Sequence, residues 1–474
     1  MFVARETELQ LLQTSYQSRE SQFIAVYGRR RIGKTVLIRE AFKDRFTFQH
    51  AGLAQGKLRE QLFAFSSSLE EAGLVFTDAP KTWLEAFNLL KRLIQESTNK
   101  RKVLFIDELS WMDTPRSGLL TALEWFWNSW ASARTDIVLV VCASATSWML
   151  NKVIHNKGGL YNRLTRQIEL KPFTLGECEQ LVRAKGIEMS RHQITECYMA
   201  MGGVPYYWNF LQKGWGVPQA LDAIFFSQNG PLAHEFDYLF SSLFRHPKDY
   251  LAIVRALGSK KAGMTREEIS HATKLENSGN LTQKLSELEA SGFIRKYHAF
   301  GKKTKGSLFQ LVDNYTLFYF KFLENNTDEQ RWSHSSNSAA VNAWRGIAFE
   351  RVCLEHISQI KRALGISGVH TELSSWQCAP QLDEGIHGSQ IDLLIARKDN
   401  VINLCEMKFA SGEYILSRTD EQAIRNKMAD FLRLTHSKDA LHTTLVTTYG
   451  LKTNAHSGVI QSVVTMNDLF TPSA

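Results

Sequence analysis

Eight residues near the N-terminus have the types and spacing needed to hold phosphate groups. An apolar run at 23–27 precedes them and a helical pattern follows, which is the context that this kind of loop requires. Glycines let backbone N–H groups turn inward, and the start of the helix adds partial positive charge. We predict that Lys34 reaches the terminal phosphates and that Thr35 binds Mg²⁺. The residues fit the pattern GxxxxGK[ST] in full and are Gly28, Arg29, Arg30, Arg31, Ile32, Gly33, Lys34 and Thr35.

An acidic pair at the end of another apolar run supplies the second half of such a site. Four apolar residues lead to Asp107, and Glu108 follows directly. Asp107 can hold the hydration shell of Mg²⁺, and Glu108 can orient or deprotonate a water that attacks the phosphate. An acidic pair after a strand can also be a solvated loop. The phosphate motif upstream favours the catalytic interpretation.

A sheet is needed to position these residues, and the first third of the sequence predicts one. Strand-like runs at 23–27, 102–106, 137–142 and 167–170 alternate with amphipathic stretches such as 82–95 and 119–131. Strands that alternate with helices indicate a parallel sheet with both faces covered. After residue 171 the alternation stops and helical patterns follow. We therefore expect an α/β core over 1–171 and a helical region over 172–240.

These features resemble the P-loop ATPase core of AAA+ proteins, in particular a bacterial and archaeal family near the STAND branch. The opening FVARETEL at 2–9 is similar to the FxxRxxEL start of that family, and Gly203-Val204-Pro205 is similar to the GxP motif of its helical lid. The resemblance implies binding and hydrolysis of ATP with Mg²⁺. It also gives Ser144 the sensor-1 position, near the γ-phosphate or the lytic water. A serine after a strand can equally be a turn residue.

The same resemblance implies an arginine finger ahead of the run at 167–170. Arg163 stands at that position, after Asn162 where relatives usually have glycine, and Arg166 is an alternative. An arginine finger supplied in trans acts on the γ-phosphate in a neighbouring molecule. This assignment therefore predicts a homo-oligomer.

Three helical patterns and a basic hairpin over 241–325 resemble a winged helix, which is a helix-turn-helix variant. The helical patterns cover 250–257, 266–273 and 279–291, and strands are expected at 293–300 and 307–312. The third helix carries Glu287 and Glu289, and winged helices also pack domains together, so a structural role remains an alternative. Cations of the wing that could contact a DNA backbone are Arg295, Lys302, Lys303 and Lys305.

A second set of residues suited to metal chemistry lies within 339–474. Asp392 interrupts an apolar strand at 390–397, and Glu406 and Lys408 follow in a strand at 400–408. Residues i and i+2 of a strand leave the same face, so a hairpin would bring the three side chains together. Burying two carboxylates and an ammonium is costly unless a cation binds between them. We predict Mg²⁺ or Mn²⁺ at Asp392 and Glu406, with Lys408 beside a scissile phosphate.

This spacing resembles that of the PD-(D/E)xK nucleases, and the resemblance adds Glu350, on an upstream helix, as a fourth site residue. Ile391 stands where that family has proline. The segment also resembles the domain of unknown function that accompanies the ATPase family above, with its aromatic entry at 312–326. The resemblance implies a restriction-endonuclease-like α/β domain that cuts DNA with a metal ion. The alternative is a structural ion pair at a sheet edge.

Composition places further limits on the class of protein. Hydrophobic residues make up 44% and charged residues 22% of the 474 positions, as in ordinary soluble domains. The net charge of +8 favours a polyanionic partner such as DNA. The six cysteines lie far apart without ligand spacing, and no run is long and apolar enough for a membrane span. We expect about three domains, a cytoplasmic location and no membrane contact.

Three hypotheses for the whole chain follow. The first is an ATP-dependent or ATP-regulated DNA nuclease, in defence or repair. The second is a STAND-like signalling ATPase, and the third is a DNA-binding regulator whose nuclease domain is inactive. Glu108 favours true ATP hydrolysis, and the complete set of Asp392, Glu406 and Lys408 disfavours the third hypothesis.

Overall fold

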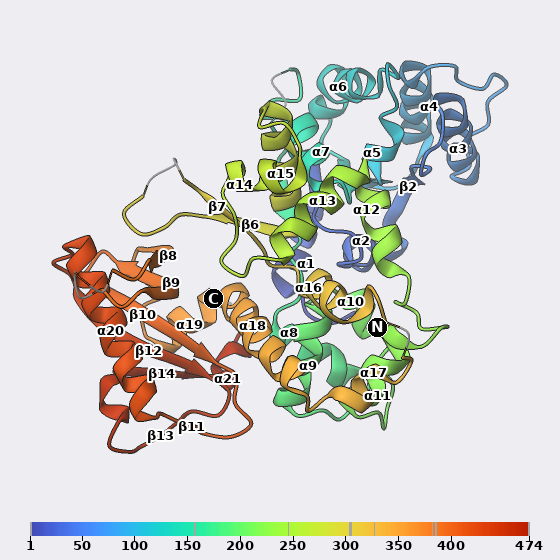
Figure 1. Ribbon diagram of the computed structural model, residues 1–474. Coiled ribbons are helices and arrows are strands. Elements are labelled where there is room, and N and C mark those ends of the chain that lie inside the picture. Colours follow the sequence, from blue (N-terminus) through green and yellow to red (C-terminus); the bar gives the residue numbers. More distant parts are fainter. Residues whose placement is uncertain are drawn as a thin grey trace. The chain divides into compact units, whose positions relative to one another are not determined.

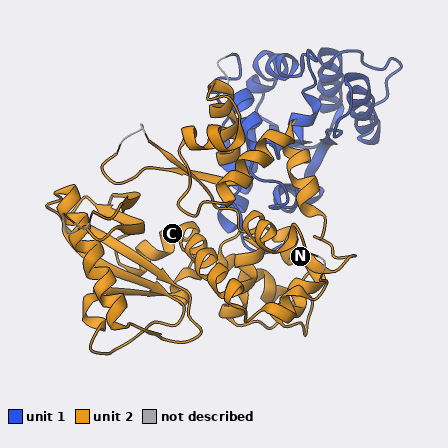
Figure 2. Ribbon diagram, in the orientation of Figure 1, with its two compact units in different colours: residues 1–172 blue, residues 173–474 orange. Residues whose placement is uncertain are grey.

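The structure is a computed structural model, and it describes residues 2–155, 158–244, 246–302, 306–326, 328–381, 383 and 386–472. The chain divides into two compact units, Met1–Pro172 and Phe173–Ala474 (Figure 2). None of the helices in the described ranges has the length and apolar character that crossing a membrane requires.

The first unit contains a five-stranded sheet in the order β2-β3-β4-β1-β5, and all of its strands run parallel (Figure 1). This confirms the predicted α/β core. Its elements are α1 Glu6–Gln17, β1 Gln22–Tyr27, α2 Lys34–Phe42, η1 Lys43–Arg45, β2 Phe46–Ala51, α3 Leu58–Glu71, α4 Trp83–Glu96, β3 Lys102–Asp107, α5 Leu109–Met112, α6 Leu119–Ser129, η2 Ala131–Ala133, β4 Ile137–Ala143, α7 Thr146–Met149, η3 Leu150–Ile154 and β5 Arg166–Glu169.

Helices cover both faces of this sheet, which explains why β1 and β4 are buried along their whole length. Successive residues of β1 enter two different hydrophobic clusters. Phe23 packs in the cluster that holds side chains of α3, α4 and α6, whereas Ile24 packs with side chains of α1 and α2. Strand β2 was missed by the sequence analysis. Its burial is weaker, with only Phe48 and His50 fully covered, so its apolar signal is short.

The second unit opens with helices, as predicted for the region after residue 171. Gly203 lies against the backbone of Phe173, whose N–H donates to the Gly203 carbonyl at 2.6 Å. A Cβ at position 203 would lie 1.8 Å from the Phe173 carbonyl oxygen, so this close approach requires glycine. The helical elements are α8 Leu175–Ala184, α9 Arg191–Met201, α10 Pro205–Trp208, α11 Val217–Leu221, η4 Asp222–Phe226 and α12 Glu235–Leu243.

Three helices and an antiparallel hairpin follow, in the order that the sequence predicts. Beyond the hairpin strand β6, the chain runs along β8, the edge strand of the C-terminal sheet. The Phe300 N–H donates to the Ser375 carbonyl at 2.8 Å, and Ala299 forms a parallel bridge with Ser375. The elements are α13 Pro247–Gly258, α14 Arg266–Thr273, α15 Gly279–Ala290, β6 Ile294–Tyr297 and β7 Leu308–Leu311.

The polar stretch 324–338, which lies between the predicted domains, is not an open linker. It contains α17 Arg331–Ser335, after α16 Asn314–Phe318 and η5 Tyr319–Leu323. Trp332 is 2% exposed and packs among aromatic rings, and the backbone N–H groups of Trp332 and Ser333 donate to the Asp222 carboxylate. A single tryptophan in a polar stretch is a weak signal of burial, and the partner aspartate is distant in sequence.

The C-terminal part of the second unit is a mixed sheet in the order β14-β12-β10-β9-β8. Strands β8, β9 and β10 pair antiparallel, and β10, β12 and β14 pair parallel. Helix α18 packs on β10 and α20 on β9 (Figure 1). The elements are α18 Ala339–Glu355, α19 Ile357–Ala363, β8 Thr371–Cys378, β9 Ser389–Arg397, β10 Val401–Lys408, β11 Tyr414–Ile415, α20 Arg418–Thr435, β12 Ala440–Thr447, β13 Leu451–Lys452, η7 Ser457–Val459, β14 Ser462–Thr465 and α21 Met466–Leu469.

Candidate active sites

Three neighbouring strands of the first unit end at one edge of the parallel sheet and carry the predicted nucleotide residues. Strand β1 leads into the phosphate loop, β3 ends at Asp107, and β4 ends just before Ser144. Because β4 lies between β1 and β3, Ser144 is positioned between the loop and the acidic pair.

The loop itself depends on its two glycines. Gly28 has φ +141°, and a Cβ there would lie 2.2 Å from the Leu170 carbonyl oxygen. Gly33 has φ +93° and precedes the first residue of α2. Ile32 is 1% exposed and packs in the core beneath the loop. The intervening arginines, Arg29, Arg30 and Arg31, are buried or half-buried, and Arg31 also has a left-handed backbone, with φ 70°.

Five residues of this edge are joined in a ring by hydrogen bonds and by one stretch of backbone. The Lys34 ammonium donates to the Ser144 hydroxyl at 3.1 Å, and Ser144 donates through its hydroxyl and its N–H to the two Glu108 oxygens. The Glu108 N–H donates to Asp107 at 2.9 Å, and the Thr35 hydroxyl donates to the other Asp107 oxygen at 2.7 Å. Lys34 and Thr35 are consecutive in sequence, so the backbone between them closes the ring.

The ring brings together the groups needed for phosphate chemistry. Lys34 is 5% exposed, and its ammonium also donates to the Gly28 and Arg29 carbonyls at 2.8 and 2.9 Å, so its position is fixed by the loop. Thr35 and Asp107 are the pair that could hold Mg²⁺. Glu108 has a left-handed backbone, with φ 48°, which turns it out of the strand direction towards Ser144. The link from Ser144 to both Lys34 and Glu108 was not predicted from the sequence.

The two candidate arginine fingers lie outside this ring. Arg163 is exposed in the segment before β5, and Arg166 donates from Nε to the Ser15 hydroxyl at 2.9 Å, so Arg166 is tied to α1. Near the N-terminus, Arg5 has φ 65° and donates to the Lys171 carbonyl, which joins the opening segment to the end of the unit.

The predicted nuclease residues converge from one helix and two strands of the second unit. Strands β9 and β10 pair antiparallel up to Leu393 and Cys405, and Asp392 and Glu406 are the next residues of the two strands. Glu350 lies on α18, which packs on β10. All four predicted residues, including Lys408, line one cavity of about 450 Å³.

Two lysines that the sequence analysis did not single out neutralise these carboxylates. The Lys261 ammonium lies 2.8 Å from Glu350 Oε1 and 3.4 Å from Asp392 Oδ2. Lys427, on α20, forms an ion pair with Glu406. The backbone carbonyl of Lys261 accepts hydrogen bonds from Gln310 and Arg351, so this lysine is held at both ends.

The electrostatics of this cavity follow from burial and from these pairs. Burial raises the pKa of Glu350, and the Asp392 carboxylate raises it further. Burial acts to lower the pKa of Lys261, but Asp392 and Glu350 outweigh it, and the net pKa is raised. Glu350 is 9% exposed, and its Oε2 has no hydrogen-bond partner among the described residues. A buried oxygen of this kind favours a further cation or donor.

The fit to a divalent metal is incomplete in this arrangement. In the part of the chain that the structure describes, no three His, Cys, Asp or Glu side chains are grouped closely enough to hold a metal ion. The carboxylates share one cavity, but each makes an ion pair with a lysine. Asp392 and Glu406 could therefore take a metal only with rearrangement of Lys261 or Lys427.

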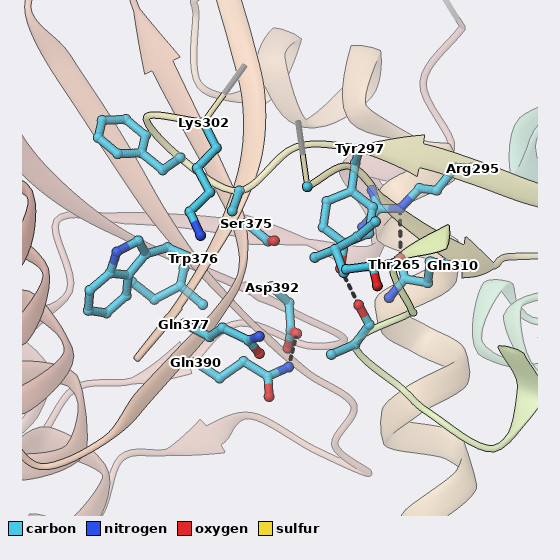
Figure 3. Close-up of a pocket in the computed structure, with 16 residues that line it drawn as sticks. Thr265, Arg295, Tyr297, Lys302, Gln310, Ser375, Trp376, Gln377, Gln390 and Asp392 are labelled. Carbon is cyan, nitrogen blue, oxygen red and sulfur yellow. Dashed lines mark hydrogen bonds between the residues drawn. The ribbon is translucent and has the colours of Figure 1, made fainter. Parts of the chain in front are cut away.

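Two of the predicted wing cations lie beside this site. Arg295 and Lys302 line a second cavity of about 290 Å³ that also has Asp392 in its wall (Figure 3). Lys303 and Lys305 lie outside the described residues.

Comparisons with known proteins bear on the first site. Residues 2–210 match the family described as an ATPase domain predominantly from Archaea. An uncharacterised protein of Methanocaldococcus jannaschii is 26% identical over 413 residues, which cover 84% of this chain and 85% of that protein. A short uncharacterised ATP-binding protein of the same organism is 40% identical over 45 residues, 10% of this chain and 76% of that protein.

Among solved structures, a Walker-type ATPase of Pyrococcus abyssi aligns with a TM-score of 0.47 and 17% identity, over 67% of this chain and 95% of that one. The matched residues 2–210 include the phosphate loop and Asp107, Glu108 and Ser144. The chain therefore belongs to the ATP-binding proteins, and its residues 2–210 form an ATPase domain of the family found predominantly in Archaea.

Proposed function

We propose that this protein uses its ATPase domain to drive or regulate metal-dependent cleavage of DNA by the C-terminal part of the chain. The observation that carries the proposal is the convergence of Glu350, Asp392, Glu406 and Lys408 on one cavity. Four residues from three elements reach this cavity although they are spread over 59 positions of sequence, from 350 to 408. Carboxylates can hold a metal ion that activates water for phosphodiester cleavage, and a lysine can stabilise the charge that develops on the phosphate.

In the ATPase domain, the ring of hydrogen bonds suggests a role for each residue. Lys34 would bind the terminal phosphates, and Thr35 and Asp107 would hold Mg²⁺. Glu108 would accept a proton from the attacking water. Ser144 would hold Lys34 and Glu108 in position, since it forms hydrogen bonds with both. Arg163 could act on a neighbouring molecule, which would require a homo-oligomer.

In the C-terminal site, Mg²⁺ or Mn²⁺ would supply a water of lowered pKa and neutralise charge on the scissile phosphate. Asp392 on β9 and Glu406 on β10, which line the same cavity, would hold the ion. Lys408 would lie against the phosphate, because it leaves the same face of β10 as Glu406. Glu350, with its free Oε2, would orient the attacking water or add a ligand.

The domain roles that go with this proposal are the predicted ones. Residues 172–240 would form the lid, 241–325 a winged helix that contacts DNA, and 339–474 the nuclease-like domain. The protein would act in the cytoplasm, in defence or repair.

A second candidate is a STAND-like signalling ATPase, or a DNA-binding regulator, whose nuclease domain is inactive. The ion pairs of Lys261 and Lys427 favour it, since each places an ammonium on a carboxylate that a metal would need. Slow ATP turnover that does not respond to DNA would support the signalling role.

The test is cleavage of plasmid and linear DNA with Mg²⁺ or Mn²⁺, with and without ATP. We expect cleavage by the native chain and its loss, by at least a hundredfold, in Glu406→Gln and in Lys408→Met. Lys398→Met is the matched control, because Lys398 follows β9 on the surface and pairs only with Glu372 among the described residues. Cleavage that persists in both site variants, or no cleavage by the native chain with either metal, would leave the second candidate.

A further inference from the structure

The second cavity, beside Asp392, has a composition that neither the ATPase nor the proposed nuclease residues explain. Its walls come from the hairpin, from the loop before α14 and from strands β8 and β9 (Figure 3). The hairpin is fixed to β8 by the backbone bonds of residues 298–300, so the walls belong to one connected structure. The cavity therefore lies between elements that backbone hydrogen bonds hold together.

One wall of the cavity carries positive charge. The Arg295 guanidinium lies 4.6 Å from the centre of the Tyr297 ring, and its Nε donates to the Gln310 side chain at 2.7 Å. Gln310 is a neutral amide, so this bond does not neutralise the Arg295 charge, on which the Asp392 carboxylate acts through space. Burial lowers the pKa of Arg295 to about 10, which shows that its charge is partly desolvated. Lys302 extends into the same cavity near Ser375 (Figure 3).

Strands β8 and β9 contribute planar amides to the cavity, next to Asp392. Gln377 and Gln390 are direct partners across β8 and β9, so their side chains leave the same face of the sheet. Asp392 follows two positions on and accepts a hydrogen bond from Gln390 at 2.6 Å. Glutamine amides pair with the edges of nucleic-acid bases, and arginine and lysine pair with phosphate.

We propose that this cavity binds one unpaired nucleotide of a DNA strand, directly beside the phosphodiester held at the carboxylate site. The inference rests on the proposed function, since Asp392 lines both cavities and thereby joins them. Arg295 and Lys302 contact the phosphate, and Gln377 and Gln390 contact the base edge. The substrate is a single strand, a flap or a frayed end.

Size separates an unpaired nucleotide from a duplex. A volume of about 290 Å³ is just below the range, from about 300 Å³ upwards, of pockets that hold one small ligand, so we expect the cavity to admit one base and not a base pair. Enzymes that act on a single nucleotide of a duplex have to flip it out, at a cost of a few kcal/mol. A strand that is already unpaired avoids this cost.

The test measures binding of the full chain to a labelled single strand and to the matched duplex, by fluorescence anisotropy in EDTA so that no cleavage occurs. Gln377→Glu adds a carboxylate to the cavity at an exposed position, and Gln381→Glu makes the same change four residues later, outside the cavity. We expect Gln377→Glu to weaken binding of the single strand at least fivefold and Gln381→Glu to leave it unchanged. Lys302→Gln should reduce the salt dependence by about one counterion.

Equal binding by the two glutamine variants would overturn the assignment of the cavity. Duplex bound as tightly as the single strand would overturn the preference for an unpaired nucleotide. Competition by a free deoxynucleoside monophosphate at the affinity of the strand would instead assign the cavity to a free nucleotide. Because binding is read without metal, the two proposals fail separately. If the native chain does not cleave DNA with either metal but Gln377→Glu still weakens strand binding, the nuclease proposal fails and the nucleotide cavity stands.

Discussion

Removal of one ammonium should turn the C-terminal carboxylates into a stronger site for a divalent cation. Lys261 bridges Glu350 and Asp392 at 2.8 and 3.4 Å, so a metal that uses these carboxylates has to displace it. Lys261→Met keeps the length and the apolar stem of the side chain and removes its charge. The adjacent Lys260 provides the matched control, because it pairs with Glu268 on the surface.

The expected magnitude follows from the two distances. At an effective dielectric constant of about 20, each contact is worth roughly 5 kcal/mol before desolvation and screening are counted. The Lys261 side chain is 38% exposed, so solvent reduces the net value of both contacts to about 1–2 kcal/mol. The dissociation constant for Mn²⁺ should therefore fall about fivefold to thirtyfold in Lys261→Met.

Calorimetric titration with Mn²⁺ at about pH 8 measures this directly, because ionised carboxylates are then favoured although burial raises the pKa of Glu350. A second readout is thermal unfolding. Without metal, Lys261→Met should be less stable than the native chain, since two carboxylates lose their counter-ion, and Mn²⁺ should restore more stability to it than to Lys260→Met. Equal Mn²⁺ affinities for Lys261→Met and Lys260→Met would refute the idea that these carboxylates form a cation site.

Two further predictions concern the ATPase domain and a buried histidine. Glu108→Gln should still bind ATP but hydrolyse it at least a hundredfold more slowly, whereas Lys34→Met should lose ATP binding. Nucleotide affinity and steady-state hydrolysis, measured on both variants, check this. Unimpaired ATP hydrolysis by Glu108→Gln would contradict the assignment of Glu108 as the base. Burial lowers the pKa of His356 to about 4, and its Nε2 accepts the Leu175 N–H, so the folded chain holds it neutral. In the unfolded chain His356 binds a proton near pH 6.5, whereas in the folded chain it does so only near pH 4. The free energy of unfolding should therefore fall by up to about 3 kcal/mol as the pH drops from about 6.5 to about 4. In urea unfolding across this range, the free energy of unfolding of His356→Gln should change less with pH than that of the native chain. An equal change in both chains would contradict the role of His356.

The parts of the structure that could be predicted are those encoded by short spacing. The loop around Lys34 and the strands at 23–27 and 137–142 are local patterns of glycine and apolar residues, and they appear in the structure within a residue or two. The hairpin of β9 and β10 is likewise local. Its paired residues end at Leu393 and Cys405, next to Asp392 and Glu406, and both acids line one cavity because the alternation of a strand fixes which side chains share a face.

The surroundings of the carboxylates were not predictable in this way. Lys261 contacts Glu350 and Asp392, which are 89 and 131 positions away in sequence. It lies in the loop before α14 next to Lys260, and two neighbouring lysines in a loop usually indicate a solvated surface. Gln310 and Arg351, both distant in sequence, donate to the Lys261 carbonyl and hold this residue beside Glu350 and Asp392, whereas Lys260 pairs with Glu268. Arg295 lines the cavity beside Asp392. A wing cation that was expected to contact a DNA backbone therefore faces a cavity, and in our proposal it contacts the phosphate of an unpaired strand rather than that of a duplex.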